Sequence, residues 1–293
     1  MIPRLGIVTP VLTMLPQAHA TWEETGTFAD VVRIAEVADA LGFSHLTCSE
    51  HVAVPVDVAA TRGARYWDPL ATFGYLAART ATIRFETHVL VLGYHHPLAI
   101  AKRYGTLDQV SDGRVILGVG VGSLEEEFDL LDAPFTDRGP RADDAMDALR
   151  AAMGRAEPVY DGEYYAFRDW IVDPAARQTR MPMWVGGRSA RSLRRAVEHG
   201  DGWAPFGLRS AEISSMLAVA RDTPAWTERD SPLEVVLQTE RPLDPSAEPA
   251  FFAERVAALQ AAGATAINFR FIHHSVEHYC EQLAATVEVL ASP

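Results

Sequence analysis

The sequence predicts a (β/α)8 TIM barrel, in which eight parallel strands close into a ring surrounded by helices. Short β-branched runs alternate with amphipathic segments along the whole chain, as strands and helices do in such a barrel. The 293 residues suit one domain spanning 1–293, because no linker or low-complexity tract divides them. A doubly wound open sheet is the alternative, and it lacks the G-x-G-x-x-G turn expected after its first strand.

The expected strands and helices follow one another in order. The first helix places Phe28, Val31 and Ala35 at helical spacing and stops at Gly42. The expected strands are residues 5–9, 45–49, 83–92, 115–119, 182–185, 202–204, 234–238 and 266–271. The expected helices are residues 28–41, 69–81, 98–110, 141–153, 189–198, 250–262 and 276–290.

Two segments exceed the minimal barrel, and insertions are expected at its C-terminal face. Residues 52–68, after the second strand, form a long loop at the face where such barrels carry their active sites. Loops of this length in a compact barrel usually form lids or substrate walls. Residues 155–173 are expected to contain a small hairpin between the fourth and fifth units.

Composition excludes several classes of partner. The net charge of −13 argues against nucleic acid, which requires a basic face, and is consistent with simple solubility. No apolar run is long enough for a membrane span or a signal peptide. Cys48 and Cys280 match no disulfide or metal spacing, which fits a reducing compartment. A cytoplasmic protein without a membrane or nucleic-acid partner is expected.

The carboxyl ends of the strands nominate the candidate site residues, because active sites of such barrels lie there. After the second strand, Glu50 and His51 offer a carboxylate beside an acid/base group that works near neutral pH. A polar loop start satisfied by backbone groups explains this pair equally well. The remaining nominated residues are Ser49, Val121, Gly122, Ser123, Gly186, Gly187, Arg188, Ser189, Arg270 and His273.

Gly187, Arg188 and Ser189 open a helix after the fifth strand and predict a phosphate site. Free amides at a helix N-terminus, a hydroxyl and a guanidinium together suit an anion, although glycine before a helix is often only a turn. Arg191 makes the same helix basic, whereas a solvated face is the simpler interpretation of Arg194 and Arg195.

Histidines outside this set suggest no metal site. His88 interrupts an apolar strand, where a buried imidazole needs a hydrogen-bond partner and is usually a satisfied core residue. The pairs at 95–96 and 273–274 have no third ligand at a metal-like spacing. No metal is therefore expected.

Residues 90–131 and 182–203 carry motifs that resemble luciferase-like flavin and deazaflavin oxidoreductases. The first contains H-P before a helix, T-L-D-x-x-S-x-G-R, and G-V-G-x-G followed by E-E-E-F; the second contains W-V-G-G-R-S. Together with S-E-H after the second strand, the resemblance covers nearly the whole chain.

The resemblance implies a role for each matching position. His51 matches the active-site histidine near the reactive ring edge, and Glu50 matches an acidic neighbour that contacts the cofactor. His88 and Val89 match a bulge where relatives carry a non-prolyl cis peptide under the ring. Val121 and Gly122 match a backbone cradle for the cofactor side chain, and Gly186, Gly187, Arg188 and Ser189 match the phosphate loop.

Within this family the pattern looks most like the branch that uses the deazaflavin coenzyme F420. The resemblance implies an oxidoreductase that transfers a hydride between F420 and a small organic substrate, with His51 as proton donor or acceptor and Glu50 tuning it. The alternative is an FMN-dependent monooxygenase that works with a partner flavin reductase. A cofactor-binding relative without activity and an unrelated barrel enzyme, such as an aldolase, are more distant readings. Relatives are often dimers, so a homodimer is expected.

One departure from the family pattern limits the class of substrate that is expected. Sugar-phosphate dehydrogenases of this branch carry an acid just after the glycines of the fourth strand and use lysines on the phosphate. Here Ser123 takes the acid's position, and Lys102, the sole lysine, is expected on a helix. No activity on glucose 6-phosphate is therefore predicted. An uncharged or weakly polar carbonyl, imine or activated alkene is expected instead, with an aromatic wall drawn from Tyr66, Trp67, Trp203 and Phe206; packing of the barrel rim would explain these aromatics almost as well.

Overall fold

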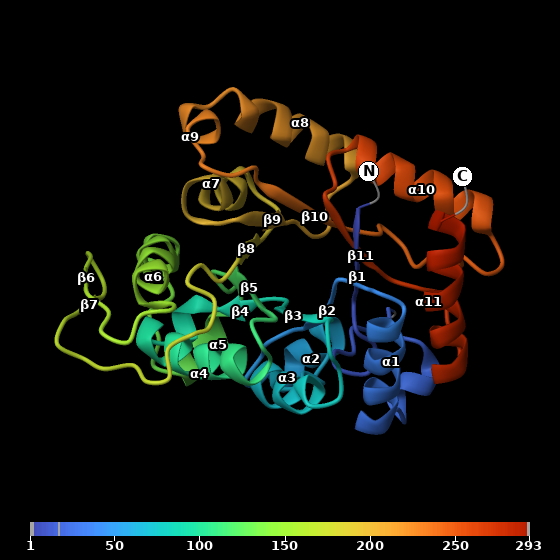
Figure 1. The fold of residues 1–293 in the computed structure, drawn as a ribbon, viewed down its shortest axis with the longest axis horizontal. Helices are drawn as coiled ribbons and strands as arrows, with labels where there is room; N and C mark the ends of the chain where they lie inside the picture. Colours follow the sequence, from blue (N-terminus) through green and yellow to red (C-terminus); the bar gives the residue numbers. More distant parts are fainter. Residues whose placement is uncertain (1–2, 17, 292–293) are drawn as a thin grey trace.

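Nine parallel strands form one closed sheet in the computed structural model, which describes residues 3–16 and 18–291. Their order is β3-β2-β1-β11-β10-β9-β8-β5-β4, and β3 also pairs with β5, which closes the ring (Figure 1). β4 continues β3 after a bulge, and the two together count as one strand of the barrel. The barrel therefore has the eight strands that the sequence predicts. The strands are β1 (Arg4–Ile7), β2 (His45–Cys48), β3 (Arg84–Thr87), β4 (Leu90–Val91), β5 (Val115–Gly120), β8 (Met183–Gly186), β9 (Gly202–Ala204), β10 (Glu234–Gln238) and β11 (Ala266–Phe269).

Helices surround the ring and cover its outer face (Figure 1). They pack as neighbours in sequence order, and α1 lies against α11, so the first and last units meet. The helices are α1 (Phe28–Ala40), α2 (Val56–Arg62), α3 (Pro69–Ala77), α4 (Pro97–Val110), α5 (Glu125–Leu130), α6 (Arg138–Ala152), α7 (Ala190–His199), α8 (Ser210–Arg221), α9 (Pro224–Thr227), α10 (Pro249–Ala261) and α11 (Val276–Ala291), with 3-10 turns η1 (Thr21–Glu24) and η2 (Leu92–Tyr94).

Alternation along the strands separates two apolar cores. Side chains that point outward from the strands pack with the helices in the larger core, as Val115, Leu117 and Val119 of β5 do. The residue between the first two, Ile116, belongs instead to a small separate cluster with one residue from each of four other strands. That cluster lies inside the barrel and consists of Ile116, Trp184, Ala204, Val236 and Ala266.

A fully buried polar layer lies in the same interior. Glu86 of β3 accepts a hydrogen bond from the Asn268 amide at 2.9 Å, and the Asn268 carbonyl oxygen contacts His45 Nε2 at 2.5 Å. Gly6 of β1 leaves room for this contact: a Cβ there would lie 2.1 Å from His45 Nε2 and 2.3 Å from Asn268 Oδ1. A buried polar group must find a partner within the protein. These side chains find their partners in one another, and their hydrogen bonds link β2, β3 and β11.

The predicted strand and helix positions agree with the structure to within a few residues, and the exceptions lie in loops. The 52–68 segment is not a plain loop, because it contains α2. Helices α5, α8 and α9 and the turns η1 and η2 were not predicted either. The expected hairpin forms from β6 (Tyr160–Asp161) and β7 (Ala166–Phe167) and stands beside α6, away from the strand ends (Figure 1).

The bond between His88 and Val89 is cis, as the resemblance implied, and it lies in the bulge between β3 and β4. Among the described helices, none combines the length and the apolarity that a membrane crossing needs.

Replacement of Gly6 by alanine tests the buried polar layer. The added Cβ would force His45 and Asn268 apart, so Gly6→Ala is expected to lower the free energy of unfolding by about 3 kcal/mol. The matched control is Gly74→Ala, because Gly74 is exposed in α3 and its Cβ would meet no atom within 4 Å. The control is expected to raise the free energy of unfolding by about 0.5–1 kcal/mol. Equal effects in denaturant titrations would contradict this account of the layer.

Candidate functional site

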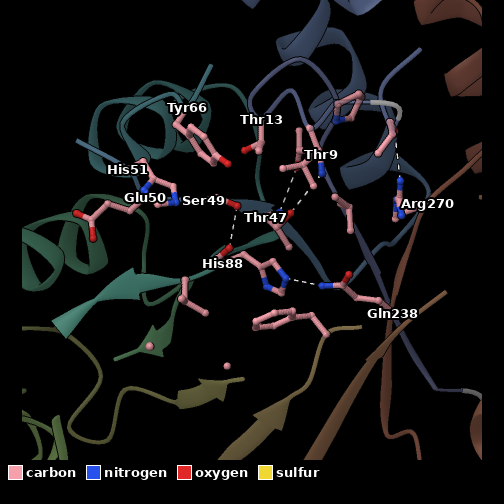
Figure 2. A pocket seen from close by; sticks show the side chains of 18 of the residues that line it. Thr9, Thr13, Thr47, Ser49, Glu50, His51, Tyr66, His88, Gln238 and Arg270 are labelled. Carbon is pink, nitrogen blue, oxygen red and sulfur yellow. Dashed lines mark hydrogen bonds between the residues drawn. The ribbon is translucent and has the colours of Figure 1, made fainter. Parts of the chain in front are cut away.

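A cavity of about 440 Å³ opens at the carboxyl ends of the strands. This volume falls within the range of small-molecule sites, and the position is the one where such barrels carry their active sites. Loops after most of the barrel strands contribute to the wall, so the site depends on closure of the whole ring (Figure 2). The predicted residues that line the cavity are Glu50, His51, His88, Val89, Val121, Gly122, Gly186 and Gly187, together with Ser49, Ser123, Arg270 and His273.

Glu127 organises one side of this cavity. Its carboxylate is buried and accepts hydrogen bonds from His51 Nδ1 at 2.6 Å and from the Tyr94 hydroxyl at 2.7 Å. It also accepts from the backbone N–H groups of Val52 at 2.6 Å and Ala53 at 3.2 Å. One side chain of α5 therefore fixes the loop after β2 and the turn η2 together.

The bond to Glu127 determines how His51 faces the cavity. A carboxylate only accepts, so Nδ1 of His51 carries the proton and Nε2 is left as the acceptor of the neutral ring. Within the described residues Nε2 has no hydrogen-bond partner, and the ring packs edge-on against Tyr66 with centroids 4.4 Å apart. His51 thus presents one free nitrogen to a bound molecule.

The pKa of Glu127 is set by opposing effects. Burial raises this pKa, but the hydrogen bonds from His51 and Tyr94 lower it by a larger amount. The net pKa of Glu127 therefore lies below its usual value. Burial together with the Glu127 bond raises the pKa of Tyr94, so this hydroxyl stays protonated. The carboxylate is therefore charged at neutral pH and can stabilise a positive charge on His51.

Glu50 lines the cavity but is already bonded on both oxygens. It accepts from the Val91 backbone N–H at 2.7 Å and contacts His95 Nε2 at 2.7 Å. These bonds tie the end of β2 to β4 and to the segment before α4. The His51 partner is thus Glu127 and not its sequence neighbour Glu50.

His88 forms part of the cavity floor and continues the buried polar layer. Its Nδ1 donates to Glu86 at 3.0 Å, and its Nε2 accepts from the Gln238 amide, as the dashed line in Figure 2 shows. Burial raises the pKa of Glu86, but His88 and the other bonds lower it by more, so this carboxylate is charged. His88 is therefore a satisfied histidine that also reaches the cavity.

Val89 packs between two glycines at the neighbouring strand ends. A Cβ on Gly120 would lie 2.6 Å from the Val89 side chain, and one on Gly186 would lie 2.7 Å from it. Gly120 and Gly186 therefore make room for the Val89 side chain. Val89 lines the cavity together with residues of the neighbouring strand ends, among them Gly122 and Gly187.

Arg188 and Ser189 are exposed and lie outside the described cavity wall. The Ser189 hydroxyl caps α7 by accepting from the Ser192 backbone N–H at 3.3 Å, so its first role is structural. Arg191 and Arg194 are also exposed, whereas Arg195 is buried and paired with Asp143. A solvated position was therefore wrong for Arg195, because its side chain bridges α7 and α6.

Two of the four aromatic residues nominated for the wall lie at the cavity. Tyr66 and Phe206 line the cavity. Trp67 instead stacks on Phe28 with centroids 5.1 Å apart, and Trp203 is fully buried with its indole N–H donated to Ser192. Both tryptophans serve helix and strand packing rather than the site.

Sequence reasoning missed Glu127, although a signal was present. Leu124, Glu127 and Phe128 follow helical spacing, and all three are buried. A glutamate on an apolar helix face needs partners, and this signal could have distinguished Glu127 from its exposed neighbours Glu125 and Glu126.

Within residues 3–16 and 18–291, no group of three or more His, Cys, Asp or Glu side chains could hold a metal ion.

Comparison with known proteins identifies the family. The model of the family described as luciferase-like monooxygenase matches residues 9–267. The chain belongs to this family. An uncharacterized protein of Mycobacterium tuberculosis is 28% identical over 220 residues, which are 71% of this chain and 76% of the relative. The F420-dependent glucose-6-phosphate dehydrogenase of Segniliparus rotundus is 28% identical over 188 residues, 63% of this chain and 55% of that protein.

Solved luciferase-like structures share the barrel. A long-chain alkane monooxygenase superposes with a TM-score of 0.79 at 13% identity and covers 99% of this chain and 91% of its own. An FMN-bound type II Baeyer–Villiger monooxygenase from Pseudomonas putida gives 0.73 at 15% identity, with 99% and 98% covered. The coenzyme F420 dependent tetrahydromethanopterin reductase of Methanopyrus kandleri gives 0.71 at 15% identity, with 97% and 98% covered. Both FMN- and F420-dependent proteins therefore use this luciferase-like fold.

Replacement of Glu127 by glutamine tests its role as the organising carboxylate. At pH 7 Glu127→Gln is expected to lower the free energy of unfolding by about 1.5–3 kcal/mol, because charge-assisted hydrogen bonds are lost. The folded pKa lies below the ordinary value of 4.5, so this contribution is present above about pH 4.5 and disappears as the pH falls through the folded pKa. Denaturant titrations across pH 3–7 measure the difference.

The control for this series is Glu126→Gln, at the exposed neighbouring position. It is expected to leave stability nearly unchanged at every pH. The organising role of Glu127 is contradicted if both variants are as stable as the original chain at pH 7.

Proposed function

We propose that the chain transfers a hydride between coenzyme F420 and a small organic substrate, a carbonyl, imine or activated alkene. The observation that carries the proposal is the His51–Glu127 pair, which turns one free imidazole nitrogen toward the cavity. A reaction in which the cofactor moves the hydride needs from the protein one proton donor or acceptor and correct positioning.

His51 supplies the proton transfer in this proposal. When an alcohol is oxidised, Nε2 accepts the hydroxyl proton and the imidazolium is stabilised by the charged Glu127. In the reverse direction Nε2 returns the proton to the carbonyl oxygen. The Tyr94 hydroxyl donates a hydrogen bond to the same Glu127 oxygen that His51 contacts, so the carboxylate keeps its orientation throughout.

The residues present fit a flavin-type cofactor. When bound, the deazaflavin ring supplies a carbon centre that donates or accepts the hydride. Val89, seated against Gly120 and Gly186, offers an apolar surface for a flat ring, and His88 borders it. Val121 and Gly122 would hold the side chain of the cofactor. Glu50 acts by holding β4 in place, since both of its oxygens are bonded.

The outer part of the site favours F420 over FMN. Gly187 leads from the cavity to Arg188 and Ser189, and Arg191 is exposed one turn further on. These exposed cations suit a long anionic tail that extends beyond a first phosphate. The F420-dependent relative and the F420-dependent reductase support the same choice. FMN with a partner reductase is the second candidate, supported by the FMN-bound monooxygenase of similar fold.

The proposed acceptor is not a sugar phosphate. Lys102 lies on α4, where its ammonium group bonds to the Asp173 carbonyl, and it is not among the described residues that line the cavity. Ser123 lines the cavity in place of an acid, and its hydroxyl accepts from Arg62 at 3.0 Å. Glucose 6-phosphate is expected to give no turnover.

Titration with oxidised F420 and, separately, with FMN tests the cofactor. Tryptophan fluorescence measures binding. We expect quenching at micromolar F420 and much weaker binding of FMN. The physical reason is the additional anionic tail of F420 beside Arg188 and Arg191. The double variant Arg188→Ala/Arg191→Ala tests this reason, because its preference for F420 over FMN should be smaller. A preference for FMN would instead assign the chain to the oxygen-using monooxygenases.

Replacement of His51 tests the proton transfer. His51→Ala is expected to reduce F420-coupled turnover at least about 100-fold, the usual contribution of a general acid or base. F420 affinity should stay unchanged, because the lost nitrogen faces the substrate. Absorbance at the F420 band with a panel of carbonyl, imine and alkene acceptors measures turnover, and His199→Asn on α7 serves as control. Unchanged turnover in His51→Ala would remove His51 from the mechanism.

A further inference from the structure

Arg270 stands at the end of the cavity opposite His51 (Figure 2). It follows β11 directly, and among the described lining residues it is the only arginine or lysine. A cation held inside a cavity of a strongly acidic chain requires an explanation, because desolvation of a charge is costly unless it is paired.

Among the described residues, Arg270 finds partners for only a small part of its hydrogen-bonding capacity. Of its five N–H donors, one from Nη2 bonds to the Ala18 carbonyl oxygen at 3.2 Å. No other bond from the guanidinium and no ion pair within 4 Å is made to the residues that the structure describes. Burial lowers the pKa of Arg270, and the more distant charge of Glu23 partly offsets this effect.

The nearby acidic and basic groups do not satisfy Arg270. Both oxygens of Glu23 are committed to backbone N–H groups, those of Val11 at 2.7 Å and Ala20 at 2.8 Å. His273 accepts from the Trp22 indole N–H at 2.8 Å, and burial lowers its pKa to about 4. His273 is therefore neutral at physiological pH, and Arg270 supplies the fixed positive charge at this end of the cavity.

We propose that Arg270 binds a carboxylate of the substrate, and that the reacting carbon of the same molecule lies toward His51. The inference deepens the proposed function, on which its second clause rests. A guanidinium presents paired N–H groups that match the two oxygens of a carboxylate. The substrate class is then an oxo acid or hydroxy acid whose acid group and reacting group lie at opposite ends.

A carboxylate fits this site better than a phosphate monoester. A phosphate carries close to two charges and is usually held by several cations or by helix amides. Here one guanidinium is present, and the polar neighbours Thr9, Thr13 and Gln238 are neutral (Figure 2). Glu23, which also lines the cavity and acts on Arg270, adds a negative charge that disfavours a ligand with close to two charges. An uncharged acceptor, expected from the sequence, would leave Arg270 with only the Ala18 carbonyl as a partner among the described residues.

Binding of two matched probes tests the inference without cofactor or turnover. The probes are 4-oxopentanoate and 4-oxopentanamide, which share size and ketone but differ in charge. By saturation-transfer NMR titration, the original chain is expected to bind the acid roughly 10- to 100-fold more tightly than the amide, as one charge-assisted contact provides. In Arg270→Met this preference should disappear, and in Arg270→Lys it should be intermediate.

Arg194→Met is the matched control, because Arg194 is exposed on α7 outside the cavity wall, and it should keep the full preference. Thermal melting confirms that each variant is folded, and Arg270→Lys keeps the test open if Arg270→Met is not. The inference is overturned if the original chain shows no preference for the acid, or if Arg270→Met retains it. A weaker F420 affinity in Arg270→Met with an unchanged acid preference would assign Arg270 to the cofactor instead. Failure of F420 to bind would count against the proposed function but would leave the probe result unaffected.

Discussion

The active face of this barrel depends on the carboxylate of Glu127. Four groups from the loop after β2 and from η2 donate to it. Because the carboxylate is buried, each donor it holds would be costly to leave unpaired. The same bonds that fix the loops also select the tautomer of His51, so the structural and chemical roles of Glu127 cannot be separated.

Beneath the active face, the barrel interior holds apolar and polar side chains together. His45, which bonds to Asn268 in the polar layer, packs edge-on against Trp184 of the apolar cluster, and Arg4 lies over the same indole ring. His88 connects the polar layer to the cavity floor through Glu86. A charged carboxylate under the floor thus holds an imidazole in one orientation, as Glu127 does at the wall. Buried carboxylates therefore orient histidines on two sides of the cavity.

Much of the fold could be predicted from periodicity, whereas the contacts of the site could not. The barrel strands stand out because β-branched runs are bounded by turns, and β9 and β10 begin and end where expected. Helix α2 has no buried residue and therefore carries no apolar stripe. Helix α8 does place Ile213, Met216, Leu217 and Ala220 at helical spacing against the core, so its sequence could have predicted it. The cis bond at His88 came from the family resemblance. The pairing of His51 with Glu127 joins residues 76 apart, and only tertiary structure shows it.

The most direct test of this account is the tautomer of His51, observed by long-range ¹H–¹⁵N correlation NMR of histidine-labelled protein. The account predicts that the neutral ring carries its proton on Nδ1, with a resonance strongly shifted by the bond to Glu127, and leaves Nε2 unprotonated. In Glu127→Gln the signal should move toward a mixture of the two tautomers. A proton on Nε2 in the original chain would contradict the account, because His51 would then have no free acceptor facing the cavity.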